Sequence, residues 1–242
     1  GQANTNSTAG ASNFDGSIQA TVKANPEAGF SIATLTPSSG AFTVGHGLNA
    51  APEFVIFKSR TQNPSSWYVY HIGAGNGGFL RLQGTDALTS DSNIFQSTNP
   101  SSSVVYSSGA SLGTTNYLMY SFAPVAGYSA FGSYEGNGQS GDSGPFVHLG
   151  FRAKFILLKN ADLAGSNWFI FDTSRNTFNV VDLNLKPNSN AAEETDSSGT
   201  LDILSNGFKM RSSGTHPNGN GNTILFAAFA ENPFQANGGL AR

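Results

Sequence analysis

The chain contains an internal duplication, and this feature constrains its fold more than any other. Five short segments of the first half have counterparts in the second half, in the same order. Lys58 and Lys159 are 101 positions apart, as are Trp67 and Trp168, the two tryptophans of the chain. Such a repeat predicts two similar units, which we expect to bury related faces against each other around a pseudo-twofold axis. The paired segments are GFS (29–31), SSGAF (38–42), FVIFK (54–58), WYVYH (67–71) and YLMYSFA (117–123), with GYS (127–129), DSGPF (142–146), FILLK (155–159), WFIFD (168–172) and ILFAAFA (224–230).

The duplication also sets the expected domain boundaries. Residues 1–28 are poor in apolar side chains and rich in small polar ones, so we predict a linker or N-terminal arm with one short strand around 18–22. The first β repeat is expected over 29–124 and the second over 125–242, with the boundary near 124–127. The second copy carries extra residues in a Gly/Asn/Ser loop around 135–141.

The repeated segments have the composition of β-strands. Short β-branched or aromatic runs of four to six residues, with turn residues on both sides, occur at 30–35, 54–57, 67–70, 155–158 and 168–171. No window keeps helical apolar spacing over three turns, and residues 223–231 are apolar throughout, so we predict a buried strand there. The expected fold is all-β, with two related sandwich-like or jelly-roll-like repeats packed together and no substantial helix.

The composition excludes several classes of protein. The net charge is −3 and charged residues make up 11%, against about 25% in an ordinary soluble domain. There is no basic stripe for nucleic acid, no cysteine for a disulfide or thiolate site, and no apolar run long enough for membrane insertion. The chain begins at Gly1, and we expect it to be a processed product or a piece of something longer.

A serine-protease-like string occurs at residues 141–145 (GDSGP) and contains Ser143. Serine catalysis needs a histidine base, an orienting carboxylate and an oxyanion hole. Residues 39–42 (SGAF) stand at the same place in the first copy, so a turn that leads into a strand explains both strings. We therefore assign no catalytic residue.

The histidines and acids do not predict a metal site or a cofactor. His46, His71, His148 and His216 lack the spacing of metal ligands, and His46 and His148 are expected to be structural partners of backbone carbonyls. The loop acids Asp86 and Asp91, and Glu193, Glu194 and Asp196, are interpreted as solvated charges rather than a calcium site.

The aromatic segments 67–70 and 168–171 lack polar alternation, which favours core packing over sugar stacking. Candidate contact residues lie where these segments end. They are His71 in the first copy, and Asp172 and Arg175 in the second.

Residues 29–32, 44–48, 52–58 and 67–71 resemble an uncharacterised domain near the C-terminal end of tail-fibre-like and other structural proteins of marine and cyanobacterial phages. The second half resembles it more closely, at residues 131–138 (FGSYEGNG), 167–172 (NWFIFD), 201–208 (LDILSNGF) and 227–234 (AAFAENPF). The resemblance covers about residues 17–242. It implies an extracellular position on a virion, on the tail or the outer surface, and carries no known catalytic residues.

We therefore expect a non-enzymatic virion structural protein, such as a tail-fibre or receptor-binding module. The expected partners are other virion proteins, the chain itself as a homotrimer, and a host surface glycan or protein. One alternative is a capsid decoration or tail-connector protein. Another is a polysaccharide-degrading hydrolase of the tailspike type, for which no loop shows a pair of acids.

Overall fold

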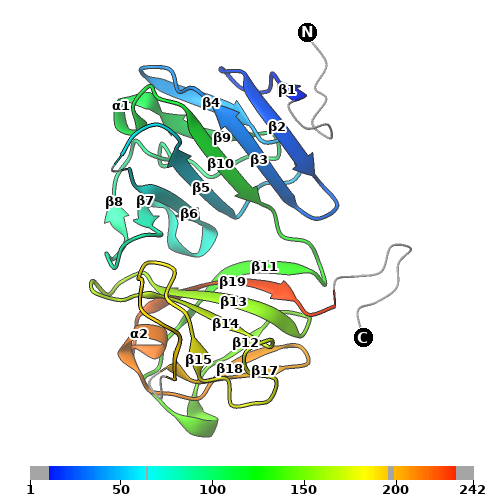
Figure 1. Cartoon of the computed structure of the whole chain (residues 1–242), viewed down its shortest axis with the longest axis vertical. Coiled ribbons are helices and arrows are strands. Elements are labelled where there is room, and N and C mark those ends of the chain that lie inside the picture. The colour runs from blue at the N-terminus through cyan, green and yellow to red at the C-terminus, as the bar shows by residue number, and fades with distance from the viewer. Residues whose placement is uncertain (1–10, 64, 196–198, 233–242) are drawn as a thin grey trace. The chain divides into compact units, whose positions relative to one another are not determined.

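The computed structural model describes residues 11–63, 65–195 and 199–232, and these residues form an almost entirely β structure (Figure 1). The all-β prediction is confirmed. Each α-helical segment among the described residues has only four residues, α1 (Gly109–Leu112) and α2 (Thr215–Asn218). Single 3-10 turns also occur, among them η1 (Ile72–Ala74) and η2 (Gly141–Ser143).

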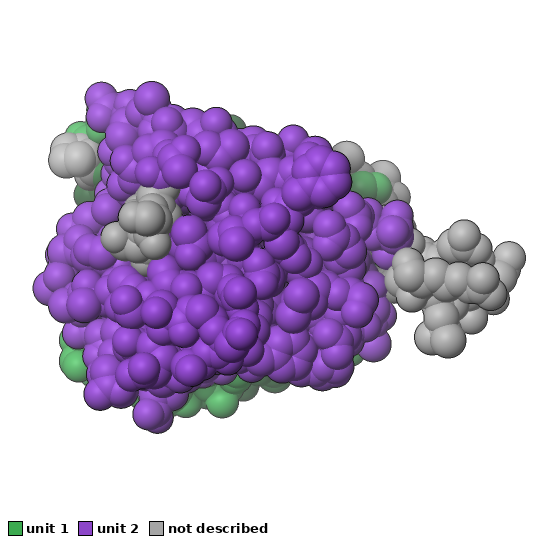
Figure 2. Space-filling view, turned by 90° about the horizontal axis from the view of Figure 1, so that it is seen from below, with its two compact units in different colours: residues 1–82, 88–124 green, residues 83–87, 125–242 purple. Residues whose placement is uncertain are grey.

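The chain divides into two compact units, coloured separately in Figure 2. Unit 1 comprises residues 1–82 and 88–124, and unit 2 comprises residues 83–87 and 125–242. The change of unit at 124/125 coincides with the repeat boundary expected from the sequence. Residues 83–87 differ from that expectation, because they lie in the first repeat but belong to unit 2.

Unit 1 is built from an eight-stranded antiparallel sheet and a two-stranded sheet. The large sheet has the order β1-β2-β3-β10-β5-β6-β7-β8, and β4 pairs with β9. The strands are β1 (Ala11–Asn13), β2 (Ala20–Asn25), β3 (Phe30–Leu35), β4 (Ala41–Gly45), β5 (Phe54–Ser59), β6 (Trp67–His71), β7 (Gly75–Arg81), β8 (Thr89–Ser90), β9 (Val104–Ser108) and β10 (Tyr117–Phe122).

The core of unit 1 lies between these two sheets. Val22, Ala33, Phe57 and Met119 of the large sheet are buried in one cluster with Val44 and Val105 of the β4–β9 pair. Two antiparallel sheets that bury one face each against the other form a sandwich-like arrangement.

The prediction of a linker or arm is wrong for residues 11–28, although the short strand expected around 18–22 overlaps β2. β2 pairs with β3 along its length, from Thr21↔Thr34 to Asn25↔Phe30, and alternates between buried and exposed positions. Its buried residues are Ala20, Val22 and Ala24, which all have small side chains. Small side chains lower the apolar content of a strand, so composition alone makes such a strand look like a linker. Residues 1–10 of the predicted arm lie outside the described part of the chain.

Unit 2 also places two main sheets around one core. A four-stranded sheet has the order β11-β19-β13-β14, a three-stranded sheet has the order β12-β18-β17, and β15 pairs with β16. The strands are β11 (Ser129–Glu135), β12 (Phe146–His148), β13 (Ala153–Asn160), β14 (Trp168–Asp172), β15 (Leu183–Asn184), β16 (Glu194–Thr195), β17 (Leu201–Leu204), β18 (Gly207–Met210) and β19 (Thr223–Ala230).

The buried cluster of unit 2 joins both sheets. Ile156, Phe171 and Ala228 of the larger sheet pack with Leu201 and Phe208 of the smaller one. β19 is paired on both edges, with β11 and β13, and five consecutive residues of it are buried. The prediction of a buried strand at residues 223–231 is therefore confirmed.

The duplicated segments occupy corresponding places in the two units. Four of them form the adjacent strands β3-β10-β5-β6 in unit 1 and β11-β19-β13-β14 in unit 2. Lys58 lies opposite Trp67 in the first set, and Lys159 lies opposite Trp168 in the second. The expected packing of one repeat against the other stays a prediction.

Candidate functional site

The large sheet of unit 1 has a second face, on the side opposite its core cluster. Side chains alternate between the two faces along β3, β10 and β5. At one end of the second face, the Phe122 ring lies 4.7 Å from the Phe30 ring and 5.4 Å from the Phe54 ring between centroids. Every second residue of each strand lies on this face, and the face becomes polar toward its other end. At the other end it presents Thr36, Asn116 and Arg60.

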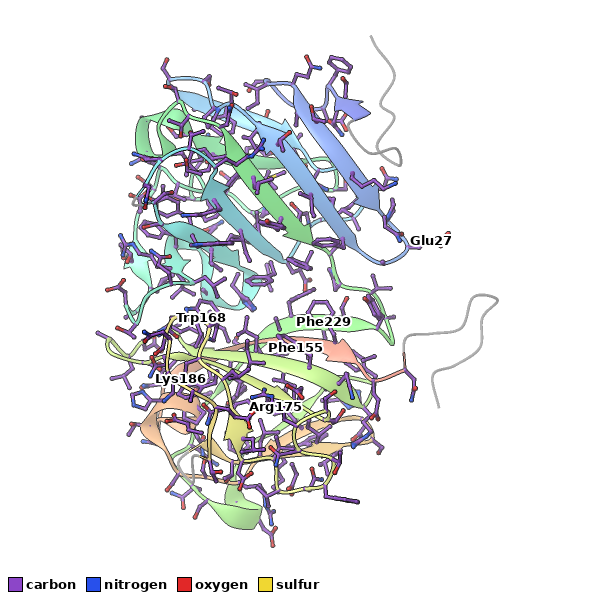
Figure 3. All side chains as sticks on the ribbon, in the orientation of Figure 1. Glu27, Phe155, Trp168, Arg175, Lys186 and Phe229 are labelled. Atoms are coloured by element: carbon purple, nitrogen blue, oxygen red, sulfur yellow. The ribbon has the colours of Figure 1, made fainter. Side chains whose placement is uncertain are left out.

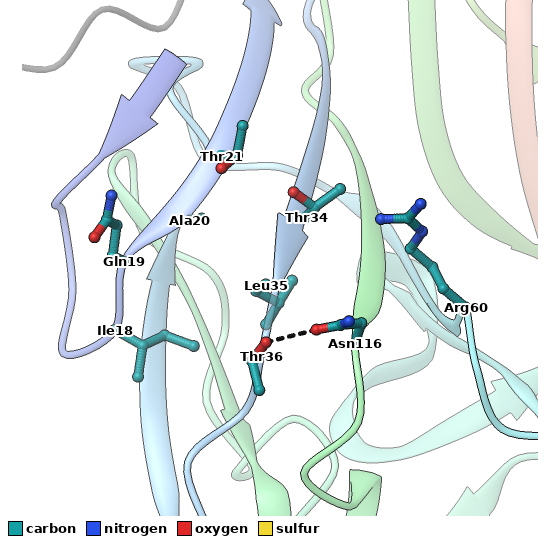
Figure 4. Close-up of a pocket in the computed structure, with 9 residues that line it drawn as sticks. All are labelled: Ile18, Gln19, Ala20, Thr21, Thr34, Leu35, Thr36, Arg60 and Asn116. Carbon is teal, nitrogen blue, oxygen red and sulfur yellow. Dashed lines mark hydrogen bonds between the residues drawn. The ribbon is translucent and has the colours of Figure 1, made fainter. Parts of the chain in front are cut away.

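A pocket of about 350 Å³ opens at this polar end of unit 1, and we call it the unit 1 pocket (Figure 4). It lies where β2 begins, β3 and β5 end, and β10 begins, so four neighbouring strands of one sheet position its lining. Its volume is in the range of small-molecule sites, about 300–1,000 Å³. The lining residues are Ile18, Gln19, Ala20, Thr21, Thr34, Leu35, Thr36, Arg60 and Asn116.

Hydroxyl and amide groups dominate the chemistry of the unit 1 pocket. The Thr36 hydroxyl donates to Oδ1 of Asn116 at 2.7 Å, which connects the end of β3 to the start of β10. The Asn116 amide nitrogen makes no hydrogen bond to another described residue, so its two donors remain available to a ligand. Thr21 and Thr34 are directly opposite each other on β2 and β3. Hydroxyl and amide groups both donate and accept hydrogen bonds, so they can pair with the hydroxyl groups of a ligand.

Arg60 is the charged residue of the unit 1 pocket, and no carboxyl group lines it. Its backbone N–H donates to the Asn116 carbonyl at 2.8 Å, which holds the end of β5 beside β10. Its exposed guanidinium forms no ion pair or hydrogen bond with another described residue. The pocket is therefore locally positive, although the whole chain has a net charge of −3.

A row of side chains crosses the second face beside the unit 1 pocket. Thr21, Thr34, Leu118, Lys58 and Trp67 follow one another on β2, β3, β10, β5 and β6. The ammonium group of Lys58 lies 5.4 Å from the centroid of the Trp67 ring and donates to the Ser65 carbonyl at 2.6 Å. Both side chains are partly exposed, so an aromatic surface and a second cation lie on the same face as the pocket.

Unit 2 places the equivalent lysine in a different environment. Lys159 donates to the Ser166 carbonyl at 2.5 Å, the counterpart of the Lys58–Ser65 bond, but Lys159 and Trp168 are fully buried. Residues 83–87 contribute to this burial, since the Thr85 carbonyl accepts from Lys159 at 3.4 Å. Burial lowers the pKa of the Lys159 ammonium group to about 8, partly opposed by the charge of Asp86. The position equivalent to Arg60 is Ala161.

The predicted contact residues Asp172 and Arg175 lie together in unit 2, at the turn that follows β14. Arg175 is labelled in Figure 3. One carboxylate oxygen of Asp172 accepts from the backbone N–H groups of Ser174 and Arg175, both at 2.9 Å. The other accepts from Nε of Arg175 at 2.6 Å, and Arg175 also contacts Glu193. Burial disfavours ionisation of Asp172, but the hydrogen bonds and charge of Arg175 outweigh it and lower the pKa of this carboxyl group. Both side chains thus stabilise the turn in which they lie.

The turn leads into a segment with the most exposed aromatic side chain of the described residues, Phe178, which is 84% exposed. The side-chain amide of Asn179 bonds to both the N–H and the carbonyl of Ile203, at 2.9 and 3.1 Å. This pair of bonds holds Asn179 against β17 while its neighbour Phe178 projects into solvent.

The third predicted contact residue, His71, lies in unit 1 and is not brought together with the other two. It is buried at the end of β6, and its Nδ1 accepts from the Gly73 N–H at 3.1 Å, which caps η1. His46 is also buried, and its two ring nitrogens bond to the Leu48 N–H and the Ser101 carbonyl. The expected contact of His46 with a backbone carbonyl is confirmed, and burial lowers the pKa of its ring. The same expectation is wrong for His148, whose exposed ring makes no hydrogen bond to a described residue and lies 6.4 Å from the Phe146 ring.

The remaining candidate motifs have local structural roles. Ser143 ends the single turn η2, and its carbonyl accepts from Nδ2 of Asn137 at 2.8 Å. Asp91 caps the turn at Asn93 and Ile94, while Glu193 and Glu194 pair with Arg175 and Lys186; Asp196 lies outside the described residues.

Among the described residues, no three acidic or histidine side chains cluster in a way that could hold a metal ion. No helix in the described ranges is long and apolar enough to cross a membrane.

Sequence reasoning missed the unit 1 pocket. The sequence feature that could have indicated this pocket is the pair Thr34 and Thr36 on one side of an otherwise apolar strand. A second such feature is Arg60, two residues after Lys58. That Thr21 and Asn116 join them depends on the strand order β2-β3-β10-β5, which no local pattern specifies.

The fold and the pocket define a class: an all-β protein of two sandwich-like units, with a polar, locally positive pocket on the sheet of the first. The chain matches the family described as Domain of unknown function (DUF7483) over residues 3–233. Because this match covers nearly the whole chain, the chain belongs to that family. No curated protein and no solved structure gives a significant match.

Proposed function

We propose that this chain is a structural protein of a phage virion that attaches the particle to the host surface, as a tail-fibre or receptor-binding module. The observation that carries the proposal is the unit 1 pocket, whose hydroxyl, amide and guanidinium groups suit a surface saccharide. The resemblance of residues 17–242 to domains of phage tail proteins supports the virion context. An extracellular position also agrees with the low content of charged residues, 11% of the chain.

The proposed role is binding without catalysis. Hydrolysis of a glycosidic bond commonly uses two carboxyl groups on opposite sides of the bond. The lining of the unit 1 pocket contains hydroxyl, amide, guanidinium and aliphatic groups but no carboxyl group. A saccharide held there would be recognised and released unchanged. The proposed partners are neighbouring virion proteins, two further copies of the chain in a homotrimer, and the host saccharide.

Immunogold electron microscopy of intact virions with an antibody against this chain tests the attachment role. We expect label at the tail or at fibre tips. An excess of the purified chain should also compete with virions for adsorption to host cells. Label spread over the head would instead identify a capsid decoration protein and would contradict the attachment role.

A further inference from the structure

We propose that the unit 1 pocket selects saccharides that carry a carboxylate, and that Arg60 binds this carboxylate. The inference rests on the proposed function, because it names the ligand class of the same pocket. It is argued from three properties of unit 1: an arginine without a protein partner, a lining that suits hydroxyl groups, and the loss of this arginine in the second repeat.

The first property is the availability of Arg60. Among the described arginines, Arg152, Arg175 and Arg211 form ion pairs with acidic side chains, and Arg81 donates to Thr89. Arg60 has no such contact, and Figure 4 shows its guanidinium extending from the end of β5 toward Thr34. A guanidinium presents paired N–H donors that match the two oxygens of a carboxylate. In a chain of net negative charge, this local cation would be needed to hold an anionic ligand.

The second property is the lining around Arg60. The hydroxyls of Thr21 and Thr34 and the free amide donors of Asn116 can exchange hydrogen bonds with ring hydroxyl groups. Ile18, which is partly buried, adds an aliphatic side chain that suits the C–H face of a sugar ring. A volume of about 350 Å³ admits one or two sugar rings rather than a long chain.

The third property is the difference between the repeats. Lys58, Ser65 and Trp67 have the equivalents Lys159, Ser166 and Trp168, and both lysines bond to the equivalent serine carbonyl. The two units therefore share this local contact. Arg60, two residues further along, corresponds to Ala161, so unit 2 forms the equivalent strands without a guanidinium at this place.

A glycan array with matched pairs tests the inference on the full chain. Each pair contains a carboxylate-bearing saccharide and its neutral counterpart: galacturonate and galactose oligomers, glucuronate and glucose oligomers, and sialylated and desialylated glycans. We expect stronger binding to the carboxylate member of at least one pair, and titration calorimetry of that pair should give a difference of about tenfold or more.

Variants of the full chain connect this selectivity to the pocket. We expect Arg60→Gln to lose about tenfold or more of the affinity for the carboxylate member and to lose the preference for it over the neutral member. Thr34→Glu places a carboxylate beside Arg60 and should also abolish selectivity. Thr34→Gln, which has a similar size but no charge, is the control for this variant. Lys154→Gln removes one positive charge from β13 of unit 2 and should bind as the unmodified chain does. Circular dichroism melting identifies any variant that fails to fold.

The inference is overturned if no carboxylate-bearing saccharide binds, if both members of every pair bind equally, or if folded Arg60→Gln keeps the selectivity. Competition for virion adsorption separates this failure from failure of the attachment role. If the unmodified chain and Arg60→Gln block adsorption equally well, attachment stands and the role of Arg60 is wrong. If neither blocks adsorption, the attachment role itself fails.

Discussion

At the scale of single residues, the two repeated lysines show how one contact can exist in two environments. Lys58 and Lys159 each donate to the carbonyl of the equivalent serine, at 2.6 and 2.5 Å. Lys58 is partly exposed and lies over Trp67, whereas Lys159 is fully buried. The hydrogen bond depends on the local sequence, but the solvation of the ammonium group depends on what else covers it.

The buried Lys159 predicts a rise in stability with pH. Its pKa is about 8 in the folded chain and about 10.4 when unfolded, so between these values the unfolded chain binds more protons. The free energy of unfolding should therefore increase from pH 8 toward pH 10, by at most about 1.4 kcal/mol per pH unit. Above about pH 10 the effect reverses, because burial raises the pKa of Tyr70, Tyr117 and Tyr134. Urea unfolding at pH 7.5, 8.5 and 9.5 measures the rise, and Lys159→Met should lack it.

Asp172 should contribute to stability through its turn. Asp172→Ala removes acceptors for two backbone N–H groups and for Nε of Arg175, so we expect a loss of about 1–2 kcal/mol. Asp172→Asn keeps an acceptor oxygen for the backbone and should lose less. Thermal unfolding of both variants measures the difference. Equal stability of Asp172→Ala and the unmodified chain would show that the turn does not need this side chain.

At the scale of elements, β2 was predicted only in part, because a short strand was expected around residues 18–22 and the structure forms β2 over Ala20–Asn25. Its buried positions carry Ala20, Val22 and Ala24, and its neighbours on the second face include Thr21. An alternation of small apolar and polar residues is a weak signal, so the sequence predicted only a short strand at 18–22 and assigned the rest of residues 1–28 to a linker or arm. The strand forms because its backbone pairs with β3 and its small side chains fill the core beneath.

Val22 provides a test of the place of β2 in the core. Its side chain is fully buried, so Val22→Asp should destabilise unit 1 by about 3 kcal/mol or more. Thr21→Asp, on the exposed side of the same strand, should change stability by less than about 1 kcal/mol. Chemical denaturation of the two variants gives the comparison. Similar stabilities would mean that residues 20–25 are not part of the folded core.

At the scale of the whole molecule, the low charge content predicts weak dependence on salt. Charged residues are 11% of the chain, and the ion pairs of the described residues include partly exposed groups. Exposed pairs contribute little and are screened by salt. We expect the Tm to change by less than about 3 °C between 50 mM and 500 mM NaCl. A large fall in the Tm would indicate charge networks that matter more than their exposure implies. Differential scanning calorimetry measures this change.

The sequence alone determined the all-β class, the strands at the duplicated segments and the place where the first unit ends, because periodicity and turn residues are local properties. It also marked His71, Asp172 and Arg175, and Asp172 and Arg175 do meet because they are three residues apart in one turn. Only the tertiary structure brought Thr21, Thr34, Asn116 and Arg60 to one pocket and joined residues 83–87 to unit 2. These arrangements depend on strand order and on contacts between residues far apart in the chain. Local patterns carry no information about which strands become neighbours.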